Sequence, residues 1–76
     1  MALNIAMVKD QLAMANRHIA TGNRVIIRQR QLIDELGVDG HDTREALALL
    51  VQFEDSQALH LADRERLTDE LNSADA

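Results

Sequence analysis

The stretch Gly37-Val38-Asp39-Gly40-His41-Asp42 interrupts an otherwise helical sequence and decides how the chain folds. Two glycines and two aspartates within so short a segment are typical of a loop. Gly37 directly follows Leu36, and glycine suits the left-handed residue just beyond the end of a helix. We therefore predict a loop over residues 37–42. A connection of about six residues favours two antiparallel neighbouring helices.

The second helix is predicted to start directly after this loop. Asp42 and Glu45 have the spacing of a capping box, in which the Asp42 carboxylate accepts a hydrogen bond from the third helical amide and Glu45 reaches back. The expected organisation is one helical-hairpin domain over residues 1–76, with helices over about 3–36 and 43–72. The scarcity of β-branched and aromatic residues argues against strands, so the predicted fold is all-α.

A seven-residue repeat runs through the first helix. Its two core positions, a and d, are almost all apolar or small, which indicates a coiled-coil seam widened toward a bundle. The a residues are Ile5, Leu12, Ile19, Ile26 and Ile33, and the d residues are Val8, Ala15, Gly22, Gln29 and Leu36. Gly22 could mark a kink, a close helix crossing or the start of the stable helix. The repeat keeps its phase through Gly22, which favours a continuous or kinked helix.

The second helix has an apolar stripe with a polar middle. Its members are Ala46, Leu49, Leu50, Phe53, Gln57, His60, Leu61, Arg64, Leu67 and Leu71. With the loop centred near residue 40, residues at the same level of an antiparallel hairpin have numbers that sum to about 79. This rule pairs Gly22 with Gln57 and Leu12 with Leu67. It also predicts that His18 and His60 face one another.

Composition predicts that one hairpin needs a partner. The chain has 76 residues, 46% hydrophobic content, one aromatic residue, no cysteine and no proline. A chain of this size has a small core and no disulfide to stabilise it, so oligomerisation is favoured. Its apolar runs are too short and its charge too high for a membrane span, which predicts a soluble protein that does not bind membranes. The first eight residues have neither the basic segment nor the cleavage site of a signal peptide, so we expect a cytoplasmic protein.

Apolar residues outside the seam predict where the partner binds. Two hairpins related by a two-fold axis would form a four-helix bundle and cover these rows, in a parallel or an antiparallel arrangement. The residues expected at the seam and the dimer interface are Ile19, Val25, Ile26, Leu32, Ile33, Leu47, Leu50, Val51, Phe53 and Leu61.

Charge is distributed unevenly along the sequence. Residues 1–36 carry five basic and three acidic side chains, whereas residues 37–76 carry three basic and ten acidic ones. Four arginines (Arg17, Arg24, Arg28 and Arg30) could form a nucleic-acid-binding stripe. A solvated helix face is the better interpretation, because no aromatic residue is interleaved and the acidic second helix would repel phosphate. We expect no nucleic-acid partner.

The histidines are the remaining candidates for chemistry. His18 and His60 are the candidate metal ligands, but neither belongs to the repeated Glu-x-x-His units that are usual in metal-binding bundles. A polar layer of His60 with Gln57 and Arg64 that fixes the register is the favoured alternative. The architecture is similar to the dimerisation and phosphotransfer domains of histidine kinases. In that family, however, an acidic residue and then a proline follow the phosphorylated histidine.

Residues 18–71 also resemble a set of short uncharacterised helical proteins of alphaproteobacteria. The most specific segments are Arg28-Gln29-Arg30, Gly40-His41-Asp42-Thr43 and Gln57-Ala58-Leu59-His60. The resemblance implies a bacterial, cytoplasmic protein without implying an activity. Two hypotheses for the function follow from the sequence. The first is a non-enzymatic interaction or dimerisation module, such as a small adaptor or regulator, that needs no cofactor. The alternative is a histidine-bearing bundle that binds a metal or takes part in phosphotransfer signalling.

Overall fold

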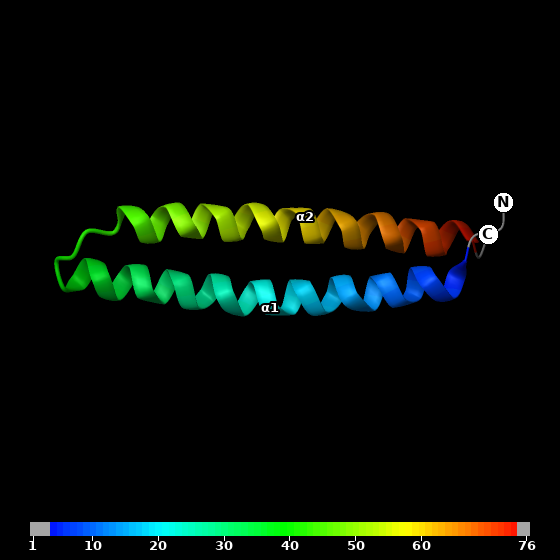
Figure 1. The fold of residues 1–76 in the computed structure, drawn as a ribbon, viewed down its shortest axis with the longest axis horizontal. Helices are drawn as coiled ribbons and strands as arrows, with labels where there is room; N and C mark the ends of the chain where they lie inside the picture. Colours follow the sequence, from blue (N-terminus) through cyan, green and yellow to red (C-terminus); the bar gives the residue numbers. More distant parts are fainter. Residues whose placement is uncertain (1–3, 75–76) are drawn as a thin grey trace.

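The computed structural model describes residues 4–74, which form two long helices packed side by side in opposite directions (Figure 1). Helix α1 is Ile5–Val38 and helix α2 is Arg44–Ala74. The predicted all-α antiparallel hairpin is therefore confirmed. The molecule is a rod of 58 × 15 × 15 Å with a radius of gyration of 17.3 Å. A compact globule of the same length would have a radius of about 11 Å.

Helix α1 ends later than the sequence predicted. It continues through Gly37 to Val38, and Gly40 is the residue with a positive φ, 77°. The amide of His41 donates to the Leu36 carbonyl at 2.9 Å, and the amide of Gly40 donates to the Gly37 carbonyl at 3.2 Å. These are the two bonds of a Schellman motif with Gly40 as its left-handed residue. The prediction that helix one ends at 36 was wrong because Gly40, not Gly37, closes the helix.

Helix α2 begins at Arg44 rather than 43 and ends at Ala74 rather than 72. The Thr43 carbonyl accepts the first helical bond, from the Leu47 amide at 2.9 Å. The Asp42 carboxylate accepts from the Arg44 amide at 3.0 Å and also binds the Arg44 guanidinium. The capping box is therefore not formed as predicted, because Asp42 binds Arg44 instead of the third helical amide. The loop covers residues 39–43, and the predicted start of helix one at residue 3 lies outside the described residues.

The predicted seam of α1 is confirmed, since every a and d residue except Ile5 is buried or half-buried. Val8 and Ala15 pack with Leu67 of α2, and Leu12 and Leu71 cover this cluster. Helix α1 runs unbroken through Gly22. On α2, Gln57 and Leu67 are buried, while the residues half-buried along the seam include Ala46, Leu50, Phe53, His60 and Leu71. Three members of its predicted stripe are instead exposed: Leu49, Leu61 and Arg64.

Candidate interaction surface

Two glutamines cross the seam and join the helices. The side-chain amide of Gln57 donates to the Ile19 carbonyl at 2.9 Å and to Asn23 Oδ1 at 2.8 Å. Near the loop, Gln29 Nε2 donates to the Ala46 carbonyl at 2.9 Å. Both glutamines are buried, at 7% and 8% exposed. Buried polar groups with such directional bonds fix which residues lie at the same level.

Gly22 provides the space that Gln57 occupies. A Cβ added at position 22 would overlap Gln57 Oε1 and would lie 2.7 Å from its Cδ. The pairing predicted from the sum rule is thus confirmed, and Gly22 marks a close approach of the two helices rather than a kink. Gln57 Oε1 is buried and has no hydrogen-bond partner.

His18 and His60 face one another across the seam, as the sum rule predicted, and their rings are stacked. Their ring centroids are 5.0 Å apart, with 15° between the ring planes. The predicted polar layer is only partly correct, because the hydrogen bonds of Gln57 go to Ile19 and Asn23, and Arg64 is exposed. No group of three or more histidine, cysteine or acidic residues is placed to hold a metal within residues 4–74.

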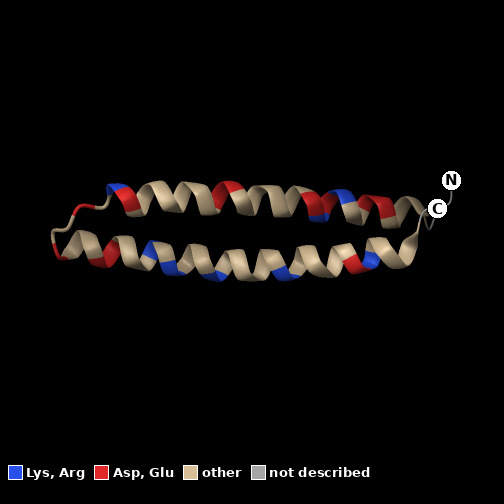
Figure 2. Cartoon of the chain, viewed as in Figure 1, with Lys and Arg blue, Asp and Glu red and all other residues tan. Residues whose placement is uncertain are grey.

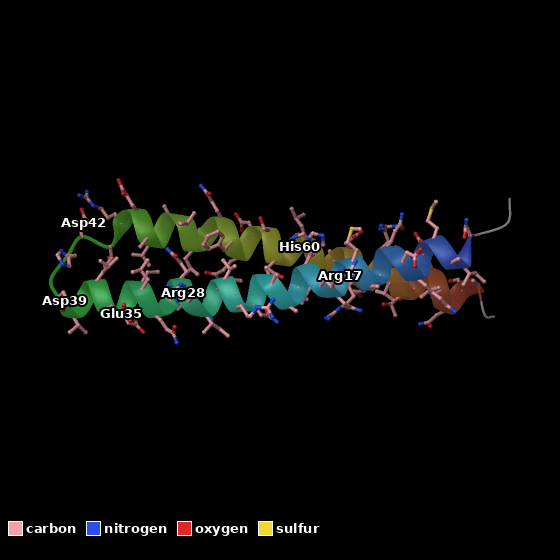
Figure 3. The ribbon with its side chains drawn as sticks, turned by 60° about the horizontal axis from the view of Figure 1, so that its bottom comes forward. Arg17, Arg28, Glu35, Asp39, Asp42 and His60 are labelled. Carbon is pink, nitrogen blue, oxygen red and sulfur yellow. The ribbon has the colours of Figure 1, made fainter. Side chains whose placement is uncertain are left out.

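A shallow groove follows the seam on one face of the hairpin. Its central part has a volume of about 510 Å³ between the helices and has Gly22 and Gln57 among its lining residues. The groove continues from this central part in both directions. The part toward the loop shares Val25 and Phe53 with the central part, and the part toward the chain ends shares His18 and His60 with it. The three parts share residues and therefore form one surface, here called the groove face. Arg17 and Arg28 border it on α1, and Figure 3 labels both with His60 on α2.

The predicted interface residues fall into three groups. Ile19 and Ile26 are buried between α1 and α2, and Ile33, Leu50 and Phe53 are half-buried in the same seam. Val25 and Leu32 line the groove and are 36% and 43% exposed. The third group consists of exposed residues of α2 that line no part of the groove: Leu47, Val51 and Leu61. The structure therefore places half of the predicted set inside the hairpin itself.

The residues of the third group lie on the other side of the hairpin. Glu54 is seven residues from both Leu47 and Leu61, so the three form one stripe along α2. Glu54 approaches Arg30 of α1 to 3.8 Å, and neither residue lines the groove. This ion pair therefore joins the helices on the side away from the groove. By helical spacing Ile27, which is 56% exposed, also lies on this side, here called the opposite face.

The two helices differ in charge (Figure 2). Helix α1 has five basic and three acidic residues, and α2 has three basic and seven acidic residues. Two of the four α1 arginines have partners on the surface: Arg24 donates to Thr21 Oγ1 at 3.4 Å, and Arg30 approaches Glu54. Exposed pairs of this kind contribute little to stability.

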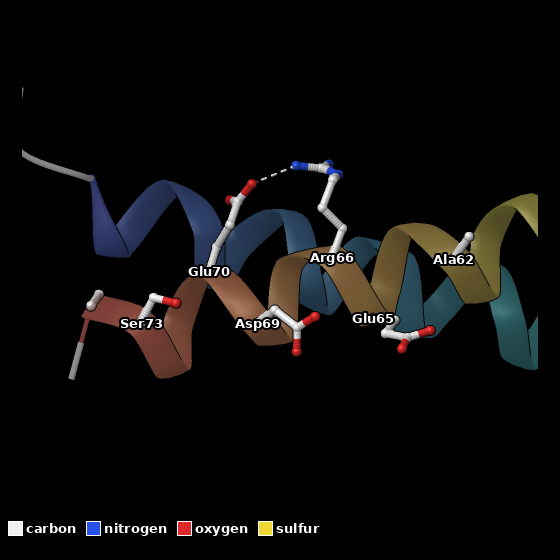
Figure 4. Close-up of a pocket in the computed structure, with 7 residues that line it drawn as sticks. Ala62, Glu65, Arg66, Asp69, Glu70 and Ser73 are labelled. Atoms are coloured by element: carbon white, nitrogen blue, oxygen red, sulfur yellow. Dashed lines mark hydrogen bonds and ion pairs between the residues drawn. The ribbon is translucent and has the colours of Figure 1, made fainter. Parts of the chain in front are cut away.

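A hollow of about 710 Å³ lies on the surface of α2 alone (Figure 4). All seven of its lining residues come from one helix, so it has no opposing wall. Arg66 spans this region by binding Asp63 at 2.7 Å and Glu70 at 2.8 Å. The hydrogen bond with Asp63, followed by smaller contributions that include the charge of Glu70, raises the pKa of the Arg66 guanidinium. This arrangement is a solvated ion-pair network and does not form a binding cavity.

The described helices contain no segment with the length and apolar content needed to cross a membrane. The chain matches no family model, and neither a curated protein nor a solved structure was found to be similar to it.

Proposed function

We propose that the chain is a non-enzymatic interaction module that dimerises through its groove face into a four-helix bundle and acts as a small cytoplasmic adaptor or regulator in a bacterium. The observation that carries this proposal is the imbalance between exposed and buried apolar side chains. Five hydrophobic residues are buried, whereas twelve large ones are exposed among the described residues. Three of the twelve, Met14, Val25 and Leu32, line the groove, and exposed apolar residues in a groove are typical of an interaction site.

The dimensions of the rod support a second copy as the occupant. One face, 58 by 15 Å, offers a footprint of roughly 870 Å², close to the about 800 Å² per partner of a standard interface. Covering the groove face would bury Val25 and Leu32 and complete the burial of Phe53. Burial of apolar area of this kind is the main favourable contribution to association.

Two matched substitutions on α1 test this proposal. Leu32→Glu places a charge in the groove, whereas Ile27→Glu places the same charge on the opposite face, where the native residue is even more exposed. We expect Leu32→Glu to raise the dimer dissociation constant by at least about tenfold, because the charge would be desolvated. Ile27→Glu should leave it unchanged within about twofold. Equal effects, or a larger effect at Ile27, measured by light scattering over a dilution series, would contradict the groove face as the dimer interface.

The stacked pair of His18 and His60 favours metal binding as a second candidate function. Two imidazoles already lie together, but a metal ion would need ligands beyond those that residues 4–74 bring together in one copy. Elemental analysis of protein purified without a metal-affinity tag tests this candidate. A stoichiometric metal that is lost in His60→Gln would support it, and its absence would leave the histidines with a structural role. Phosphotransfer, the other form of this alternative, predicts a phosphohistidine that is lost in the same variant.

A further inference from the structure

The groove face is not uniform along its length. Near the loop, the apolar side chains of Val25, Leu32 and Phe53 line it together with Arg28 and Glu35. Toward the chain ends the lining has less apolar surface, where Met14 and Ala15 lie beside Gln11, Asp63 and Arg66. The apolar side chains near the loop contact apolar side chains of the second copy when the loop parts of the two grooves meet. This requirement restricts how the second copy can be oriented.

The charges of the helices restrict it further. Two hairpins can pack face to face around a two-fold axis that runs either along the helices or across them. An axis along the helices places α1 opposite α2 of the partner copy, so that each basic helix has acidic neighbours. An axis across the helices places α1 against α1 and α2 against α2, which pairs like charges. Opposite charges across an interface favour the first arrangement.

Resting on the proposed dimer, we infer that the two copies associate around an axis parallel to the helices, with both loops at the same end. In this arrangement the two copies overlap along the full length of the rod, and the loop parts of their grooves meet. With the crosswise axis and full overlap, the loop part of each groove meets the less apolar part of the other groove. Sliding the copies until only the loop parts overlap restores the apolar contact. It also brings Arg28, which lines the loop part of the groove, close to Arg28 of the partner.

Distances between the two copies at both ends of the rod test this inference. The chain has no cysteine, so Val38→Cys at the loop end and Asn72→Cys at the other end each introduce one site for a spin label. Val38 is 88% exposed and Asn72 is also exposed, and neither lines the groove. Pulsed electron paramagnetic resonance then measures the distance from each label to its equivalent in the partner copy.

We expect both label pairs to lie within about 30 Å, because two hairpins that are each 15 Å thick lie side by side at both ends. A crosswise axis with full overlap places the two equivalent labels at opposite ends of the rod. The distance within each label pair is then most of the 58 Å length. The slid arrangement keeps the loops closer but moves the Asn72 labels further apart. A distance above about 40 Å at either end therefore overturns the inference.

This experiment also separates failure of the inference from failure of the proposed function. Dimeric mass with a long distance at either end contradicts the orientation alone. Monomeric mass without dipolar coupling contradicts the dimer and the orientation together. The control is to mix each labelled variant with excess unlabelled protein. Most dimers then carry only one label, so a dipolar signal that arises between two copies must become much weaker.

Discussion

Gly22 of α1 and Gln57 of α2 lie at the same level of the seam, and the Gln57 side chain fills the space that a Cβ at position 22 would need. A glycine in the middle of a helix is destabilising by about 1 kcal/mol relative to alanine. Here its absence of a side chain lets Gln57 reach Ile19 and Asn23 of the facing helix. Gly22, one of the two glycines of α1, is thus a residue of weak helix propensity that makes the buried hydrogen bonds possible.

Gly22→Ala should therefore destabilise the protein, although alanine favours helix. Gln57 would have to leave the seam and lose its two bonds, each contributing about 1 kcal/mol. We expect a net loss of roughly 1–3 kcal/mol in the free energy of unfolding. Denaturant melts at a fixed protein concentration measure this change.

The same substitution in a Gln57→Ala background reverses the sign. With the glutamine side chain gone, the methyl group introduced by Gly22→Ala has room, and helix propensity should stabilise the protein by about 0.5–1 kcal/mol. Additive effects in this double-mutant cycle would show that the two side chains do not share the space.

The other two glycines should respond in opposite directions. Gly37→Ala lies in the helix with open space around its Cβ, and we expect a gain of about 0.5–1 kcal/mol in stability. Gly40→Ala must adopt a φ of 77° and should lose about 1–2 kcal/mol. Thermal melts of both variants check the assignment of Gly40 as the left-handed residue. Stabilisation by Gly40→Ala would mean that α1 ends elsewhere.

The seam was predictable from the sequence because a seven-residue repeat reports the core face of a helix directly. The pairing of Gly22 with Gln57 followed from the position of the loop alone. The helix ends were less predictable, because Gly37 and Gly40 are both suitable closing residues and the local pattern does not choose between them. Capping was ambiguous for a similar reason, since Asp42 and Thr43 are adjacent N-cap residues.

The candidate site was predictable only in part. The sequence placed His18 opposite His60, but ring stacking depends on side-chain rotamers that no spacing encodes. It also assigned Arg64 to the polar layer, whereas Asn23, on the border of the seam of α1, is the residue that meets Gln57. A groove face and an opposite face can be distinguished only when the positions of both helices relative to one another are known. The sequence alone therefore identified Leu32 and Leu47 as apolar interface candidates, but it could not show that they lie on different faces.

Asp42 should titrate at a lower pH than an ordinary aspartate. The hydrogen bonds from the Arg44 guanidinium, and then from the Arg44 amide, lower its pKa from the usual 3.8. A carboxyl with a lowered folded-state pKa contributes stability above its unfolded pKa and loses it as the pH falls through the folded value. Carboxyl-detected NMR titration should show the lowered pKa in the native chain.

Arg44→Ala should move the pKa of Asp42 back toward 3.8, with Arg64→Ala as a control that leaves Asp42 unchanged. Because both Asp42 and Arg44 are exposed, the effect should weaken at high salt. An Asp42 pKa that does not respond to Arg44→Ala would contradict this pairing.

Phe53→Ala should weaken both the hairpin and the dimer. The ring is half-buried in the seam and lines two parts of the groove. We expect a loss of roughly 2–3 kcal/mol in the free energy of unfolding. This is less than the loss of about 3–5 kcal/mol that results from removal of a fully buried phenylalanine ring. Leu59→Ala, at a side chain that is 73% exposed, is the control and should change stability by less than about 0.5 kcal/mol. A loss under about 1 kcal/mol for Phe53→Ala would place the ring outside the seam.

The mass of the native chain in solution tests the proposed dimer most directly. Sedimentation equilibrium between about 1 and 100 µM covers the range in which a standard interface of this size associates. We expect twice the single-chain mass of 8.5 kDa at the upper end of this range, with reversible dissociation on dilution. A mass of 8.5 kDa at every concentration would contradict the proposed dimer, because the groove face would then remain uncovered.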